Sequence, residues 1–224
     1  MIFQRVYRLH NRLRLFFFSV LFIALGVQQS QAQDWKLVKD SEGIKVYTRT
    51  TDAMDYKAFK SIATIDAELS SFVALIKDVK ALKDWGYKLK SSSLLKRQGD
   101  TVQIYFAEAK APFPYKNRYG IYLNEFTWNN NQKELYVSID LLENYDYHEE
   151  DLVMLKGKGY WRVTQLENSK LEVVFEMQVD PGKGVPAWLS NLFADESPYE
   201  TMRSVKEEII KPQYQNKQFD FLSN

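Results

Sequence analysis

The stretch from Asp180 to Phe193, "DPGKGVPAWLSNLF", connects the two structural patterns that decide the fold of this chain. Its first residues, Asp180-Pro181-Gly182, are typical of a tight turn. Pro186 follows at a position where proline starts a helix well, because the first helical N–H groups need no intrahelical partner. Tryptophan, two leucines and phenylalanine then crowd into the first two helical turns. This crowding predicts an apolar surface beneath the helix.

A strand precedes this turn. In "LEVVFEMQV", residues 171–179, apolar side chains alternate with Glu172, Glu176 and Gln178. One apolar face and one polar face are typical of a strand in an antiparallel sheet. The same alternation, interrupted by turn-like residues, predicts strands at 43–50, 56–66, 87–95, 102–109, 118–128, 134–142, 154–165 and 171–179.

Two segments show helical spacing instead. In residues 67–85, "AELSSFVALIKDVKALKDW", apolar side chains recur at three- and four-residue steps, and Asp66 precedes them as a candidate N-cap. The second helix extends from about residue 186 to residue 211. Pro198 lies near its middle and predicts a kink or a break, because proline removes a backbone donor.

This order of elements predicts an α+β fold in which a curved antiparallel sheet grips the C-terminal helix. A large antiparallel sheet curls as it twists, and its concave face needs a cover. A single helix about 10 Å across does not fill the concavity of so many strands. Either side chains fill the remainder or a cavity is left. An aromatic content of 15% is compatible with both outcomes.

Residues 1–32 have the three regions of a signal peptide. Four arginines and no acidic residue come first, the apolar run Leu15–Val27 follows, and Ser30 and Ala32 form a small-x-small cleavage pair. The apolar run is shorter than the roughly 20 residues that span a bilayer. We therefore expect cleavage near Ala32 and export to the periplasm or the extracellular space, with an uncleaved anchor as the alternative.

Charge and cysteine content exclude several classes of function. Removal of residues 1–32 leaves 26 basic and 29 acidic residues without a basic block, which is a poor match to nucleic acid. The chain has no cysteine. This excludes a lipid anchor on cysteine, a thiol nucleophile and a zinc–thiolate site.

Four short motifs occur in the order and spacing of the START domain family, the steroidogenic acute regulatory protein-related lipid-transfer domains, and the chain resembles that family from Trp35 to about Pro212. The motifs are "GIKVYTR" (43–49), "APFPYKNR" (111–118), "GYWRV" (159–163) and "VDPGKGVPAWLSN" (179–191). The chain departs from the family at Arg118-Tyr119, where Arg-Asp is frequent. This departure puts a structural ion pair at that position in doubt.

The resemblance implies a helix-grip fold over residues 33–224, with the C-terminal helix as a lid over a tunnel for one lipid. It also implies that the loop 111–116 flanks the mouth of the tunnel. We expect the protein to bind a single lipid or other hydrophobic ligand, to contact membranes transiently, to transfer the ligand between them and to act as a monomer. The lid and mouth candidates are Phe113, Pro114, Val185, Trp188, Leu189 and Leu192.

Strand parity adds candidates for the tunnel wall. Tyr105 shares a strand face with Ala107, and Asn124 shares the face of the next strand with Phe126. Tyr105 and Asn124 would suit a ligand hydroxyl or ester, and Phe126 would add apolar wall. The alternative is that these are ordinary strand residues that face solvent.

Catalytic readings have weaker support. The acidic stretch 140–151, "DLLENYDYHEED", matches no calcium loop and is interpreted as a solvated connection. His148 is the only histidine after residue 32, and neither a Gly-x-Ser-x-Gly elbow nor a His-Glu-x-x-His helix occurs. We expect no catalytic residue, metal or cofactor. A cavity enzyme of the cyclase or hydratase kind and a ligand-sensing module stay open as alternatives, as does the identity of the ligand.

Overall fold

The structure is a computed structural model that describes residues 34–51 and 54–223, with side chains except at 51, 54, 55 and 187–193. Within it, Trp35–Asn224 forms one compact unit. The predicted signal peptide, 1–32, lies outside the described residues. No helix in the described part of the chain is long and apolar enough to cross a membrane.

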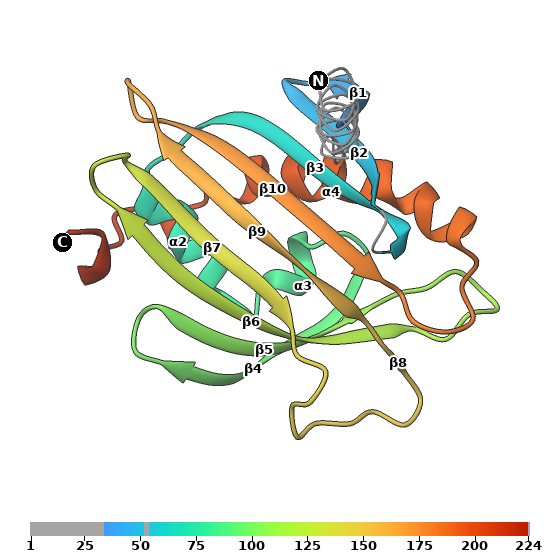
Figure 1. The fold of residues 1–224 in the computed structure, drawn as a ribbon. Helices are drawn as coiled ribbons and strands as arrows, with labels where there is room; N and C mark the ends of the chain where they lie inside the picture. The colour runs from blue at the N-terminus through green and yellow to red at the C-terminus, as the bar shows by residue number, and fades with distance from the viewer. Residues whose placement is uncertain (1–33, 52–53, 224) are drawn as a thin grey trace, which may run out of the picture. The chain divides into compact units, whose positions relative to one another are not determined.

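Ten strands form one sheet in the described residues, in the order β1-β2-β3-β10-β9-β7-β6-β5-β4, with β8 paired to β6 (Figure 1). The neighbours along this order are antiparallel, and only the short β8 pairs in parallel. The strands are β1 Lys36–Ser41, β2 Ile44–Thr51, β3 Met54–Asp66, β4 Leu89–Gln98, β5 Val102–Ala109, β6 Arg118–Asn129, β7 Glu134–Leu141, β8 Val153–Met154, β9 Lys156–Gln165 and β10 Lys170–Asp180.

The first helical segment differs from its prediction. Residues 67–85 form two helices, α2 Leu69–Lys77 and α3 Leu82–Trp85, instead of one. The chain turns between them because the Asp78 side chain accepts a hydrogen bond from the Ala81 N–H at 3.2 Å. The predicted N-cap is also wrong. Asp66 ends β3 and lies 3.6 Å from the Lys170 ammonium, and Glu68 takes the N-cap position instead.

The predicted turn at residues 180–182 and the helix after it are both present in the structure. Gly182 has a φ of +77°, in the left-handed region that favours glycine, and its N–H donates to Asp180 Oδ1 at 2.8 Å. Helix α4 Ala187–Glu208 follows and is continuous through Pro198, so the predicted break is absent. Two 3₁₀ turns, η1 Pro212–Tyr214 and η2 Asp220–Leu222, close the chain.

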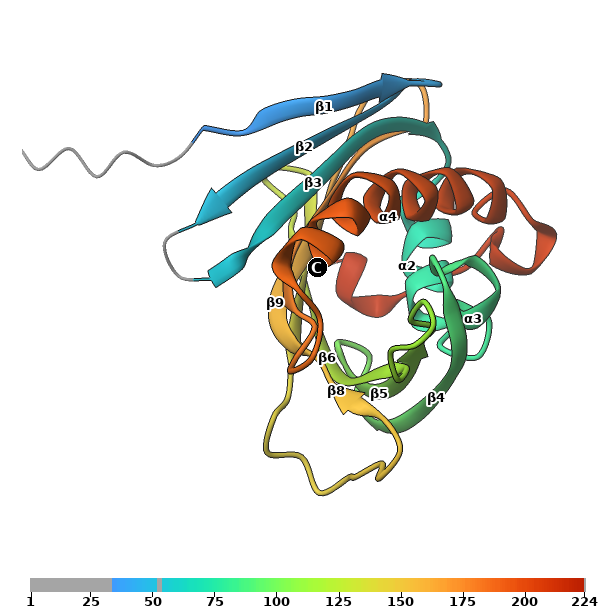
Figure 2. The same cartoon turned by 90° about the vertical axis from the view of Figure 1, so that its right-hand side faces the viewer.

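Helix α4 lies against the concave face of the sheet, where it contacts β2, β3, β10 and α3 (Figure 2). Its C-terminal half supplies Met202, Val205 and Ile209, which are fully buried in the main core. Burying one such side chain stabilises a fold by about 1.5–3 kcal/mol. The helix-grip α+β fold predicted from the sequence is thus confirmed, and the C-terminal half of α4 is its fixed end.

The opposite face of the sheet carries a smaller core. Phe106, Tyr119 and Ile121 are buried there, and the segment 142–154 covers them with Tyr145, Tyr147 and Leu152 among other side chains. The acidic stretch 140–151 is therefore held to the sheet by its aromatic residues, while its charged side chains face outward. In the described part of the chain, no group of His, Cys, Asp or Glu could hold a metal ion.

Candidate ligand cavity

A cavity of about 320 Å³ lies between the concave face of the sheet and the lid. Strands β3, β5, β6, β9 and β10, the turn around α3, the loop after β5 and the described part of α4 contribute its walls. Most of the lining side chains are aliphatic or aromatic. The volume is at the lower end of the range of about 300–1,000 Å³ that is usual for ligand sites.

Three small residues lie side by side next to the cavity. Ser92, Ala107 and Gly120 stand directly opposite one another across β4, β5 and β6, and cross-strand partners share a face. None of the three projects far above the sheet. The Tyr122 ring leans over Gly120, where an added Cβ would come within 2.6 Å of it. Ala107 itself lines the cavity, so a larger side chain at that position would enter the space that the cavity occupies.

Stacked aromatic rings form one end of the cavity. Trp161 and Phe175, which are register partners on β9 and β10, stack with their centroids 4.1 Å apart. Phe59 on β3 meets Phe175 edge-on at 5.7 Å. Because these rings lock one another in place, this end of the cavity is apolar and fixed.

The opposite wall carries the buried polar groups. Tyr105 and Tyr122 are register partners on β5 and β6, and their rings stack at 5.1 Å. Burial raises the pKa of both hydroxyls, that of Tyr122 to about 12, so both are neutral donors at physiological pH. Asn124 hydrogen-bonds to the Tyr105 hydroxyl. Its side chain is 2% exposed, and its Oδ1 has no hydrogen-bond partner among the described residues.

An unsatisfied buried carbonyl costs about 1–3 kcal/mol. The Asn124 Oδ1 atom is therefore a site where a hydroxyl or amide donor of a ligand would stabilise the protein. The neutral Tyr105 hydroxyl beside it could donate to an ester or carbonyl oxygen. This pair gives the apolar part of the cavity a point of polar recognition.

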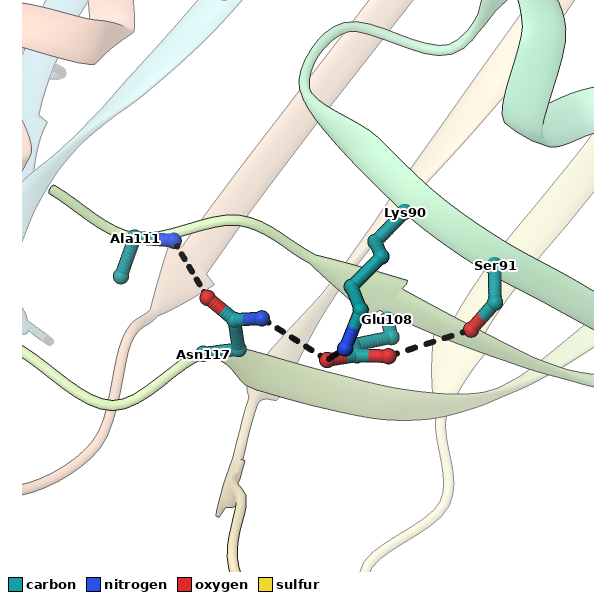
Figure 3. A network of polar contacts seen from close by, with 5 residues as sticks. All are labelled: Lys90, Ser91, Glu108, Ala111 and Asn117. Atoms are coloured by element: carbon teal, nitrogen blue, oxygen red, sulfur yellow. Dashed lines mark hydrogen bonds and ion pairs between the residues drawn. The ribbon is translucent and has the colours of Figure 1, made fainter.

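The loop between β5 and β6 is anchored at its base by a buried carboxylate (Figure 3). Glu108 accepts hydrogen bonds from Asn117 Nδ2 at 2.8 Å, Lys90 Nζ at 3.0 Å and Ser91 Oγ at 3.2 Å. Asn117 Oδ1 accepts from the Ala111 N–H at 3.1 Å, which closes the neck of the loop. Burial by itself would raise the pKa of Glu108, but these hydrogen bonds outweigh it and lower the pKa.

The structure separates the predicted site residues into four groups, of which the last contains Phe126 alone. Tyr105, Asn124 and Val185 line the cavity. Phe113 and Pro114 do not line it, because they stand at the exposed tip of their loop, Phe113 with 97% of its surface accessible. The side chains of Trp188, Leu189 and Leu192 lie outside the described residues.

Phe126 is buried away from the cavity. Its ring packs 6.2 Å from that of Phe221 in the main core. Parity correctly put Phe126 on the same face as Asn124, but two residues along a strand move a side chain by about 7 Å. That displacement carries Phe126 past the end of the cavity to a region covered by the C-terminal segment.

Several lining residues were not predicted. Tyr122 shares the face of Asn124 two residues earlier, so parity could have found it. Trp85 comes from the short helix α3, which was not expected as a separate element. Arg118 lines the mouth, and nothing in the local sequence pattern marks its side chain as buried.

Comparisons with known proteins were made for the sequence and for the structure. No protein-family model matches the chain. An uncharacterized protein of Pseudomonas aeruginosa is 27% identical over 78% of this chain and 86% of its own length. The phosphatidylcholine transfer protein of Mus musculus is 25% identical over 70% of this chain and 75% of its own length.

Solved structures give the same result. The STAR-related lipid transfer protein of Xanthomonas axonopodis superposes with a TM-score of 0.73 at 27% identity, over 79% of this chain and 99% of that one. Human StAR-related lipid transfer protein 5 has a TM-score of 0.71 at 12% identity, over 85% and 93% of the two chains, a likeness of fold alone. The resemblance to the START domain family that the four motifs predicted is therefore confirmed, and the chain has the fold of the STAR-related lipid transfer proteins.

Proposed function

We propose that the protein binds one lipid in this cavity and transfers it between membranes. The observation that carries the proposal is the largely apolar cavity itself, enclosed by the sheet and α4 and supplied with a buried polar pair, Tyr105 and Asn124. The relatives whose names describe lipid or phosphatidylcholine transfer support lipid binding by this fold.

The energetics of such a carrier follow from the hydrophobic effect. Burial of one CH₂ group is worth about 0.8 kcal/mol, so a sixteen-carbon chain in water is unfavourable by on the order of 12 kcal/mol. The cavity offers the chain an apolar environment comparable to the bilayer, so exchange is close to balanced. Movement at the mouth then controls the rate of transfer.

Phe113 is our candidate for the contact with the membrane surface. Its loop tip is exposed, and Lys110 and Lys116 flank it as exposed cations. An aromatic side chain beside lysines suits the boundary between headgroups and acyl chains. This arrangement would hold the mouth of the cavity at the bilayer during exchange. Export through residues 1–32 remains part of the proposal.

The test has two parts. Native mass spectrometry of protein purified without detergent should show one lipid per chain, removable by organic extraction. Vesicle-to-vesicle transfer should fall several-fold in Phe113→Ser. It should not change in Ile210→Ser, a matched loss of an exposed apolar side chain (64% accessible) after the C-terminal end of α4.

The results distinguish lipid transfer from the two alternative functions. A chain that takes up no lipid from mixed vesicles would overturn lipid binding and move the cavity-enzyme alternative to first place. A bound lipid without transfer would leave a ligand-sensing module. Equal transfer by Phe113→Ser and the unaltered protein would refute the role of the loop tip.

A further inference from the structure

The charged side chains that line the cavity all carry the same sign. Among the described residues that line the cavity there are four basic side chains and no carboxylate, and the basic residues are Lys57, Lys88, Lys110 and Arg118. The whole chain is nearly balanced, with 30 basic and 29 acidic residues, so composition does not account for this set. An apolar cavity lined by one sign of charge concentrates groups of the opposite sign.

Arg118 is the most informative of the four. It is 6% exposed, yet its side-chain hydrogen bonds run to three backbone carbonyls: from Nε to Pro181 O at 3.2 Å, from Nη2 to Lys183 O at 3.4 Å, and from Nη1 to Lys116 O. No ion pair of the described residues includes it. Buried charges are normally paired, so this guanidinium lacks the counter-charge that its burial calls for.

The guanidinium also keeps the means to bind an anion. It has more N–H donors than the three carbonyls occupy. Burial lowers its pKa, but an arginine stays charged at any physiological pH. Its planar fork matches the oxygens of a phosphate or a carboxylate.

Of the neighbouring lysines, Lys110 strengthens the same field most, whereas Glu196 partly offsets the charge of Lys88. Lys110 is exposed on the rim, and no side-chain hydrogen bond or ion pair in the described part of the chain involves it. Lys88 stands across the mouth, 4.0 Å from Glu196 of α4, with both side chains about half exposed. Lys57 adds a further charge from β3.

We propose that the ligand carries an anionic headgroup, a phosphate or a carboxylate, that binds Arg118 at the mouth while its hydrocarbon part occupies the cavity. This inference rests on the proposed lipid-binding function and deepens it. Arg118 and Asn124 share a face of β6 and stand six residues, about 20 Å, apart. The anion site is thus distinct from the Tyr105–Asn124 pair deeper in the cavity. A neutral lipid would leave Arg118 without a counter-charge, and a choline group would bring a cation among lysines.

In the experiment, different lipids in a single population of vesicles compete for the cavity. Delipidated protein is incubated with vesicles that contain equal amounts of phosphatidylglycerol, phosphatidylcholine, diacylglycerol and a fatty acid with matched acyl chains, and is then separated. Mass spectrometry quantifies the lipids that it has captured. All lipids share one surface, so attraction of the protein to a charged membrane does not change their ratio.

We expect the anionic lipids to exceed phosphatidylcholine at least tenfold, a difference of about 1.4 kcal/mol. The ratio of phosphatidylglycerol to fatty acid separates phosphate from carboxylate recognition. Arg118→Gln should abolish the preference and Lys110→Gln should lower it about threefold. Lys133→Gln, which alters an exposed lysine in the β6–β7 turn, should leave it intact.

The outcomes separate this inference from the proposed function. Captured lipid that mirrors the vesicle composition, or that favours phosphatidylcholine, refutes the anionic headgroup while lipid binding stands. Capture of no lipid refutes both. If Arg118→Gln fails to fold, because its carbonyl contacts hold two loops, Lys110→Gln decides. An unchanged preference in that folded variant counts against the basic mouth.

Discussion

Substitution of Ala107 by leucine should separate a ligand cavity from an ordinary core, because the two predict opposite changes in stability. Ala107 is 2% exposed and lines the cavity from β5, with Ser92 and Gly120 as its cross-strand neighbours. Leucine adds three carbon atoms that would enter the open space. At about 0.8 kcal/mol per buried CH₂, the lipid-free protein should gain up to about 2 kcal/mol in free energy of unfolding.

Ala63→Leu is the matched control. Ala63 is equally buried, but its register partners are Ile44 and Val173, both fully buried, and it does not line the cavity. The same three atoms should therefore overpack the core and cost about 1–3 kcal/mol.

Urea unfolding of delipidated protein measures both changes, and native mass spectrometry measures lipid occupancy. Ala107→Leu should be more stable than the unaltered protein and should retain less lipid. Loss of stability equal to that of Ala63→Leu, with lipid occupancy unchanged, would show that the space near Ala107 is not the ligand site.

Three further predictions address the polar groups and the N-terminal segment. Asn124→Leu removes the unpaired Oδ1 together with the hydrogen bond to the Tyr105 hydroxyl, so the two effects should largely cancel and the empty protein should change by less than about 1 kcal/mol in a urea titration. Capture of a hydroxylated lipid should fall about tenfold, and an equal loss for a lipid without a hydroxyl would contradict this role. Burial raises the pKa of Tyr122 to about 12. Its contribution to the free energy of unfolding is therefore complete below the pKa of tyrosine in the unfolded chain, about 10, and is lost as the pH rises toward 12. Tyr122→Phe should reduce the alkaline loss of stability but not abolish it, because Tyr105 also has a raised pKa; an unchanged pH profile would exclude Tyr122 as a contributor. Intact-mass measurement of the exported protein should place the mature N-terminus near residue 33, and a retained segment 1–32 would favour the uncleaved anchor.

At acid pH we expect the dependence of stability on pH to have the opposite sign. The lowered pKa of Glu108 means that its stabilising effect is complete above its unfolded pKa and is lost as pH falls through the folded value. In Glu108→Gln the loop 110–117 should lose an anchor, and the dependence of stability on pH in the acid range should become shallower than in the unaltered protein. Thermal unfolding between pH 7 and pH 3 measures this slope, and an identical slope in the variant would refute the assignment.

Local periodicity predicted much of the fold because successive side chains of a strand point to opposite faces of the sheet, so every second residue lies on the same face. Strand β5 was predicted with its observed bounds, and parity placed Tyr105 and Asn124 on the face that holds the cavity. Parity specifies a face but not a depth, which is why Phe126 was assigned to the wall and lies in the core. Strand β1 was missed because it is an edge strand whose side chains are mostly exposed, so "KLVKDS" has little alternation.

The polar contacts at the mouth could not be predicted in the same way. Arg118 is held by the carbonyls of Lys116, Pro181 and Lys183, and every residue has a carbonyl. Which carbonyls converge on a guanidinium depends on tertiary structure that connects residues more than sixty positions apart. The break between α2 and α3 was not predicted, but the sequence contains a signal for it, because aspartate, here Asp78, often caps turns.

The contacts around the mouth also indicate which side of it opens. The loop 110–117 is fixed at its neck by Asn117, whose Oδ1 accepts from the Ala111 N–H and whose Nδ2 donates to the buried Glu108 carboxylate. Near its middle, α4 is linked across the mouth by the half-exposed Lys88–Glu196 pair at 4.0 Å, and such surface pairs contribute about 0–1 kcal/mol. The C-terminal half of α4 is anchored by fully buried side chains. Among the described contacts, the hydrogen bonds at the neck of the loop are therefore stronger than the Lys88–Glu196 pair, so we expect the side of the mouth at Glu196 to open before the loop does.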